Sequence, residues 1–138
     1  MKKNLKSKVG DLFHIPLIDG RFAVGQIVDQ WREGAICIAL FDEVHNDVSQ
    51  KLVSGVQNLK VVSLPSVSKS EVDKGHWPVF DSAQIEVNLE LAPHHQFANM
   101  DYIGATWMSG GMVEDLLNAY FCGATWEPYP GRPGHLKS

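Results

Sequence analysis

The chain has 138 residues, 44% of them apolar, which is enough for one domain with a hydrophobic core and too few for two. No apolar run reaches the roughly 20 residues of a membrane span, and the basic start MKKNLKSK leads into no apolar signal core, so we expect a cytoplasmic protein with no membrane partner. Two cysteines, Cys37 and Cys122, make no disulfide framework, and we expect both to be reduced.

The net charge of -4 is unevenly distributed along the chain. Four of the 12 basic residues lie within residues 1–8, which we expect to form a flexible arm before a single domain at residues 9–138. Without these lysines, 8 basic residues face 16 acidic ones, and residues 75–131 contain no Lys or Arg. Nucleic-acid binding depends on Lys and Arg that neutralise phosphates, so the composition argues against it and favours a basic protein partner. Solubility alone is the alternative reason for the acidity.

The first predicted elements are two strands, residues 11–17 and 22–31, joined across Asp19-Gly20. Such a pair is typical of tight hairpin turns because glycine accepts the positive φ that they require. Within the second strand, Gly25 indicates a bulge or the close packing of another backbone or a large ring. A hairpin that bends there suits a small, strongly curved sheet or barrel.

Residues 35–41 are apolar at every position, which predicts a central strand buried on both faces. We expect residues 42–47 to form a solvated polar loop, because their carboxylates and His45 match no metal-site spacing. Residues 59–64 predict a further strand, and residues 66–74 a polar connection without core-forming periodicity.

After a short β segment at residues 76–80, residues 84–91 alternate strictly between apolar and polar side chains, which predicts a strand. Glu86 and Glu90 then share its exposed face, about 13 Å apart, too far to share a proton. The face is therefore either an acidic recognition surface or merely solvated.

Residues 112–121 carry a continuous apolar stripe at helical spacing and predict the main helix. We expect Glu114 and Asp115 in its first turn and Gly123 as its left-handed cap. The predicted fold is α+β: a strongly curved antiparallel sheet or small SH3-like barrel, with this C-terminal helix packed on it.

No catalytic motif of a hydrolase, kinase, metalloprotease or dinucleotide-binding enzyme occurs in the sequence. Cys122 lies beside the apolar stripe of the helix, a poor place for a nucleophile. The adjacent His94 and His95 have no third ligand at metal-binding spacing. We therefore expect no enzyme activity, no cofactor and no metal.

One set of residues resembles a known family. The pattern Gly10-Asp11-x-Phe13-x-Ile15-Pro16-Leu17, Asp19-Gly20, Phe22-Ala23 and Gly25-Gln26-Ile27-Val28 is similar to the opening of the Immunity protein 26 family, and His76-Trp77-Pro78-Val79 resembles its later tryptophan-containing segment. The resemblance implies a bacterial immunity protein of a polymorphic or contact-dependent toxin system, which neutralises a toxin of its own cell or kin.

Together, the charge and the resemblance predict that the chain occludes a cognate toxin C-terminal domain stoichiometrically, and that this toxin is basic and of the nuclease type. We expect binding through exposed carboxylates, with a partly exposed tryptophan as anchor: Asp42, Glu43, Asp47, Glu86, Glu90, Trp31 and Trp77. Two alternatives remain open. One is a small β-barrel regulatory or peptide-binding module that docks a proline-rich or extended segment on Trp31, Trp77 or Trp107, and the other is an uncharacterised hydrolase that uses His94 and His95.

Overall fold

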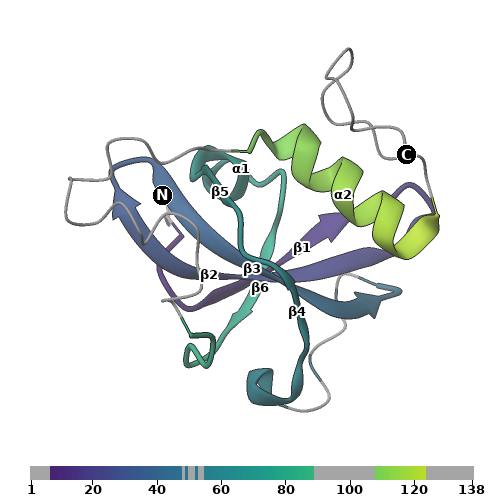
Figure 1. Ribbon diagram of the computed structural model, residues 1–138, viewed down its shortest axis with the longest axis horizontal. Coiled ribbons are helices and arrows are strands. Elements are labelled where there is room, and N and C mark those ends of the chain that lie inside the picture. Colours follow the sequence, from purple (N-terminus) through teal and green to yellow (C-terminus); the bar gives the residue numbers. More distant parts are fainter. Residues whose placement is uncertain (1–6, 48, 50–51, 53–54, 89–107, 124–138) are drawn as a thin grey trace.

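A curved, unclosed antiparallel sheet and one main helix make up this α+β fold (Figure 1). The structure, a computed structural model, describes residues 7–47, 49, 52, 55–88 and 108–123. The strands are β1 (Asp11–Pro16), β2 (Phe22–Arg32), β3 (Ala35–His45), β4 (Val61–Ser63), β5 (Ser66–Ser68) and β6 (Val79–Ser82). They follow the order β4-β3-β2-β1-β6, and β5 pairs with the beginning of β3. The helical elements are η1 (Val56–Asn58), α1 (Ser70–Asp73) and α2 (Gly110–Cys122).

The hairpin of β1 and β2 confirms the prediction made from Asp19-Gly20. Leu17 N–H donates to the Arg21 carbonyl at 2.9 Å, which closes a three-residue loop, and Gly20 adopts a φ of 90° within it. Three-residue hairpin loops need a left-handed residue at this place, which glycine adopts without a steric penalty.

Close ring packing at Gly25 is confirmed as well. Gly25 lies opposite Phe13 in the ladder, and a Cβ there would come within 2.7 Å of two Phe13 ring carbons. The Phe13 ring stacks in turn on Trp77, with centroids 5.7 Å apart and planes inclined by 9°. The missing side chain of Gly25 thus provides the space in which the aromatic pair sits.

The sheet has a separate hydrophobic core on each face. On one side, here called the helix face, Phe13, Ile15, Ile27, Ile36, Ile38 and Leu40 pack with Trp77 and with Val113 and Leu117 of α2. On the other, the loop face, Leu12, Val24, Val28, Cys37, Ala39 and Phe41 pack with Val56 and with half-buried residues of segments 59–64 and 80–87. Every residue from Ala35 to Phe41 is buried, which confirms the predicted central strand.

The predicted strand at residues 84–91 is wrong over its described part, because residues 84–88 form no strand. Their burial alternates as expected, with Ile85 and Val87 half-buried against the loop face and Glu86 exposed. The segment crosses over the side chains of the sheet instead of pairing along an edge, so the apolar period reflects one-sided burial. Residues 89–91 lie outside the described part.

Two further expectations are corrected. Residues 66–74 contain β5 and α1, because the backbone of Ser66–Ser68 pairs with β3 and needs no apolar period. Helix α2 begins two residues early, since the Ser109 hydroxyl accepts a hydrogen bond from Met112 N–H at 3.1 Å. Glu114 and Asp115 therefore lie beyond its first turn.

The end of α2 follows the prediction: Gly123 takes the left-handed conformation with a φ of 72°. Among the described residues no helix has the length and apolarity of a membrane span.

Candidate functional site

Asp42 and Glu43 form a bulge in β3, where the sequence predicts a loop. Val24 of β2 pairs with Phe41 and Ala23 pairs with Val44, so two residues of β3 have no counterpart on β2. Strand pairing resumes beyond them and continues to His45, which is why the loop expectation for residues 42–47 is wrong over its first four positions. A bulge redirects side chains while the strand keeps its place. Asp42 is exposed and Glu43 half-buried at this edge.

Glu43 also ends a buried chain of hydrogen bonds. Its carboxylate accepts from His45 Nε2 at 2.9 Å, and His45 Nδ1 lies 2.8 Å from His14 Nε2. Because Nε2 of His45 donates to the carboxylate, its Nδ1 is the acceptor, and His14 Nε2 must carry the other hydrogen. This chain of hydrogen bonds thus fixes the orientation of both imidazoles and holds the Glu43 carboxylate in place.

This histidine pair is structural. Both rings are fully buried, and His14 stacks on Phe80 with centroids 3.9 Å apart. Burial, and to a smaller extent the proximity of His45, lowers the pKa of His14 to about 4. His14 Nδ1 has no hydrogen-bond partner, consistent with a bare lone pair. The described residues include no cluster of three or more metal-ligating side chains, so the pair stands without a third ligand there.

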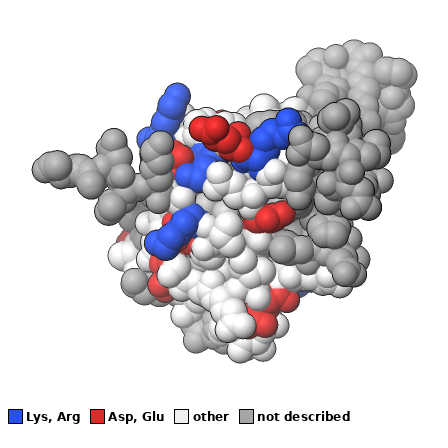
Figure 2. Space-filling model, turned by 90° about the vertical axis from the view of Figure 1, so that its left-hand side faces the viewer, with Lys and Arg blue, Asp and Glu red and all other residues white. Residues whose placement is uncertain are grey.

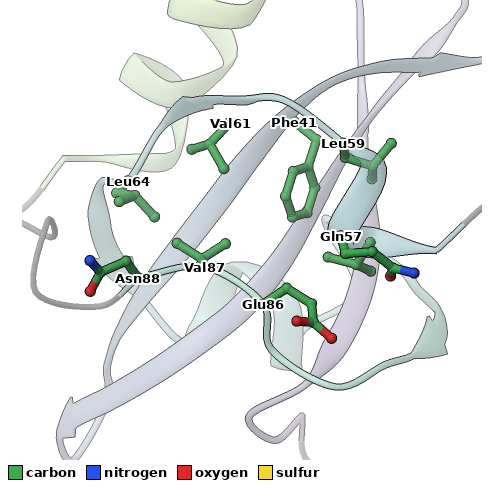
Figure 3. Close-up of a pocket in the computed structure, with 9 residues that line it drawn as sticks. Phe41, Gln57, Leu59, Val61, Leu64, Glu86, Val87 and Asn88 are labelled. Atoms are coloured by element: carbon green, nitrogen blue, oxygen red, sulfur yellow. The ribbon is translucent and has the colours of Figure 1, made fainter.

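A cavity of about 300 Å³ opens on the loop face, between the segment 56–64 and residues 86–88 (Figure 3). Its floor is buried and apolar, its walls are half-buried aliphatic side chains, and its rim is polar. The lining residues are Phe41, Val56, Gln57, Leu59, Val61, Leu64, Glu86, Val87 and Asn88. The structure thus places Glu86, one of the sequence-predicted residues, at the edge of an apolar hollow. Phe41, in its floor, immediately precedes Asp42.

Gln26 positions the segment that carries Glu86, and sequence reasoning missed it. Its fully buried side-chain amide donates to the carbonyls of Ala83, at 2.9 Å, and Gly10, at 3.2 Å. Ala83 N–H donates in turn to the Gly10 carbonyl at 3.0 Å. A polar residue in an otherwise apolar stretch of β2 was the available signal, since a buried amide needs partners.

The expectation that Trp31 and Trp77 are partly exposed is wrong. Trp31 is 8% exposed and Trp77 fully buried, and each indole N–H has a partner: Ser66 Oγ at 3.1 Å and Glu114 Oε2 at 3.0 Å, respectively. Each ring belongs to one of the two cores, on the loop face and the helix face.

Asp47, two residues after β3, is exposed and accepts hydrogen bonds from the backbone N–H and hydroxyl of Ser49, which lower its pKa. Asp42, Glu43 and Asp47 therefore lie within six positions at one end of β3. Glu90 lies outside the described residues.

Basic side chains gather elsewhere on the surface. Of the six Lys and Arg residues in the described part of the chain, Lys8, Lys69 and Lys74 line a hollow near the first described residues, together with Asp73 and Glu33. Figure 2, which shows the left-hand side of Figure 1, has positive and negative side chains mixed in its upper half. Lys69 Nζ bonds both oxygens of Asp73, at 3.0 and 3.1 Å. This face is therefore less suited to a basic partner than the end of β3.

The described residues offer little for covalent catalysis. Burial, with a smaller contribution from Asp29, raises the pKa of the Cys37 thiol to about 12, so this cysteine stays protonated and unreactive. The Glu43–His45–His14 chain has the order of a catalytic triad, but its free nitrogen is fully buried.

Comparison with known proteins agrees with these observations. Neither the curated proteins nor the solved structures include a match to this chain. The family model of Immunity protein 26 matches residues 8–109, which spans β1 to β6, the cavity and the carboxylates at the end of β3, and stops at the N-cap of α2. The match covers far more than the two stretches that carry the sequence resemblance. The chain belongs to the Immunity protein 26 family.

Proposed function

We propose that this protein occludes a basic toxin domain stoichiometrically, in the cytoplasm, through the acidic end of β3 and the neighbouring rim of the cavity. Membership of the family implies an immunity protein with a toxin as partner and a non-enzymatic, inhibitory role. The finer part of the proposal is that the toxin is of the nuclease type and meets Asp42, Glu43, Asp47, Glu86 and Glu90. Nucleases that hold phosphate backbones need basic surfaces, and an acidic inhibitor complements them.

The bulge in β3 is the observation that supports this proposal most directly. It presents Asp42 and Glu43 from a paired strand, and the Glu43 carboxylate is oriented by His45. Asp47 follows on the same edge, held by Ser49. Carboxylates on a rigid element lose less conformational entropy on binding than carboxylates on a flexible loop, so more of their attraction remains as affinity.

A charge-reversal experiment tests the proposal. The chain and the toxin C-terminal domain encoded by its neighbouring gene are co-expressed, and association is measured at low and high salt. Asp42→Lys combined with Glu86→Lys is expected to slow association by roughly tenfold or more at low salt, because steering is lost.

Glu33→Lys combined with Asp115→Lys is the matched control. Both residues are exposed and lie away from the proposed surface, Glu33 on the turn between β2 and β3 and Asp115 on α2. It carries the same change in net charge. Equal slowing by both pairs would mean that only net charge matters, and unchanged association of the first pair would contradict the proposed surface.

The peptide-binding alternative has lost its main support, because it requires exposed aromatic side chains and Trp31 and Trp77 are buried. Trp107, its third tryptophan, lies outside the described residues, as do His94 and His95 of the hydrolase alternative.

A further inference from the structure

We propose that the cavity on the loop face receives one lysine or arginine side chain of the toxin, with its alkyl stem on the apolar walls and its cation at Glu86. This inference rests on the proposed function and deepens it by naming the group that the surface recognises. It assigns the cavity one occupant and one orientation.

The size of the cavity suits a single long side chain. About 300 Å³ is the lower limit of small-molecule sites in proteins, which bury most of a drug-sized ligand. Phe41 and Val56 close the floor, 0% and 4% exposed, while Leu59, Val61 and Val87 of the walls are half-buried. Figure 3 shows the Glu86 side chain beside Gln57 at one side of the opening, with the Phe41 ring behind them. The cavity therefore offers apolar contact inside and a carboxylate at its mouth.

The charge at the mouth selects the chemistry of the occupant. Among the described residues Glu86 is exposed and makes no hydrogen bond or ion pair. Lys60 lies between two lining residues, Leu59 and Val61, in the sequence. Neighbouring side chains in an extended segment point to opposite sides, and Lys60 is not among the lining residues. An aliphatic occupant would partly desolvate Glu86 without pairing it, and an anion would be repelled. Lysine and arginine bury their stems on apolar surface and keep the charge at the edge, which satisfies both requirements.

The surroundings hold this arrangement in place. Gln26 fixes Ala83, three residues before Glu86, and Ile85 packs into the core of the loop face. On the opposite wall, Asp42 N–H donates to the Lys60 carbonyl at 2.8 Å, which ties the segment between η1 and β4 to the bulge. A carboxylate on an anchored backbone gains more from a cation than one on a mobile segment, because less backbone freedom is lost on binding.

A small-molecule probe tests the cavity without the toxin. The shifts of the methyl signals of Leu59, Val61 and Val87 are followed by NMR while n-pentylammonium, n-pentanol or n-pentanoate is added. We expect saturable shifts with n-pentylammonium, affinity about fivefold lower for the alcohol, as for one exposed ion pair, and no saturation with the carboxylate. Glu86→Gln should make the ammonium and the alcohol equal. Equal or tighter binding of the alcohol or the carboxylate by the wild-type protein, or the absence of shifts at these methyls, would overturn the proposal.

The toxin domain provides the second test. Val87→Phe fills the cavity and should weaken binding at least tenfold, while Glu86→Gln should weaken it about fivefold. Val79→Phe and Glu33→Gln are the matched controls, because Val79 is an exposed valine of β6 outside the cavity and Glu33 lies at the other end of β3. Circular dichroism of each variant verifies that it is folded.

The outcomes separate the two proposals. If the wild-type chain binds the toxin domain and Val87→Phe and Glu86→Gln bind equally well, the cavity proposal is wrong and the proposed function stands. If the wild-type chain fails to bind or protect against the domain, the proposed function fails, and the toxin side chain assigned to the cavity fails with it, whatever the alkylammonium probe does.

Discussion

The two faces of the sheet are closed in different ways. On the helix face, α2 and Trp77 cover the strands, and Val113, Leu117 and Trp77 are all fully buried. On the loop face, the cover consists of η1, the short β4 and irregular segments, whose residues are mostly half-buried and leave a cavity. Strands β1, β2 and β3 therefore contribute to both faces, a tightly packed helix face and a more loosely packed loop face.

Under the proposed function, this difference separates stability from recognition. A regular helix buries a continuous stripe, while loops cover a sheet through isolated side chains, which leaves both hollows and polar rims. The Glu43 and Glu86 carboxylates lie by the loop face, with the bulge and the cavity. Loop-bearing surfaces held by a rigid scaffold are the usual place of binding residues. The helix face serves chiefly to hold the scaffold together.

The largest expected effect comes from truncating the helix face. Leu117→Ala should lower the free energy of unfolding by about 3 kcal/mol, because it leaves a void among fully buried neighbours. Val87→Ala, on the loop face, should cost about 1 kcal/mol or less, because Val87 is only half-buried. Urea unfolding measures both. Similar losses would show that the two faces contribute equally to stability.

Acid should act through the loop face, where His14 is held neutral. Its pKa is 6.5 in a free side chain and about 4 in the fold, so the unfolded chain takes up the proton first as the pH falls. The contribution of neutral His14 to the free energy of unfolding is therefore fully present above pH 6.5. It is lost as the pH falls to about 4, by roughly 3 kcal/mol for this group alone. Urea unfolding at a series of pH values measures the decline.

Two variants assign this pH dependence. His14→Gln should flatten the decline between pH 6.5 and 4, while His76→Gln should preserve it, because His76 is exposed. A decline that survives in the His14 variant would assign the effect to other groups.

A third experiment tests the packing of the helix face at Gly25. Gly25→Ala should destabilise the fold by about 2 kcal/mol, because the new methyl group meets the Phe13 ring, which is backed by Trp77 and cannot retreat freely. Gly111→Ala is the control. Its Cβ would meet only Ser109 Oγ, at 4.0 Å, and it lies in a helix, so the change should stabilise the protein by about 0.5 kcal/mol. Thermal unfolding compares them, and a neutral Gly25→Ala would mean that the aromatic pair is loosely packed.

The smallest effect concerns the attachment of the loop segment. Gln26→Leu should cost about 1 kcal/mol, since the Ala83 carbonyl loses its side-chain partner. It should also weaken n-pentylammonium binding, because Glu86 is no longer held in place. Gln30→Leu, an exposed position on the same strand, should change neither quantity. An unchanged affinity of the Gln26 variant would show that the segment is positioned by Ile85 and Val87 alone.

Local patterns predicted the scaffold well. The hairpin at Gly20, the ring against Gly25, the central strand at Ala35–Phe41 and the cap at Gly123 all depend on neighbouring residues or on the period of one strand, and each is confirmed. Residues 84–88 show the limit of this reasoning. An apolar period of two reports burial on one side, which a coil lying over a sheet also produces.

The site depends on contacts between distant residues. His14 and His45 are 31 positions apart, and Gln26 and Ala83 are 57 apart, so no local pattern announces either bond. Composition indicated only that acidic side chains would be abundant on the surface. Their positions come from tertiary structure, since Asp42 and Glu43 lie in the β3 bulge and Glu86 on the segment that crosses the loop face. The burial of Trp31 and Trp77 likewise follows from tertiary packing, which propensity does not describe.

The bulge in β3 contains two residues, and this number matters for how the surface can vary. Side chains alternate along a strand, so an even insertion leaves the later residues on their original sides: Leu40 and Val44 both pack on the helix face, and Phe41 and His45 both point to the loop face. Removal of Asp42 alone would reverse Val44 and His45 and expose an imidazole that now bonds His14. Removal or addition of residues in pairs changes the charge displayed and preserves the register. Sequence variation at this edge can therefore alter the displayed charge in steps of two residues while the fold stays the same.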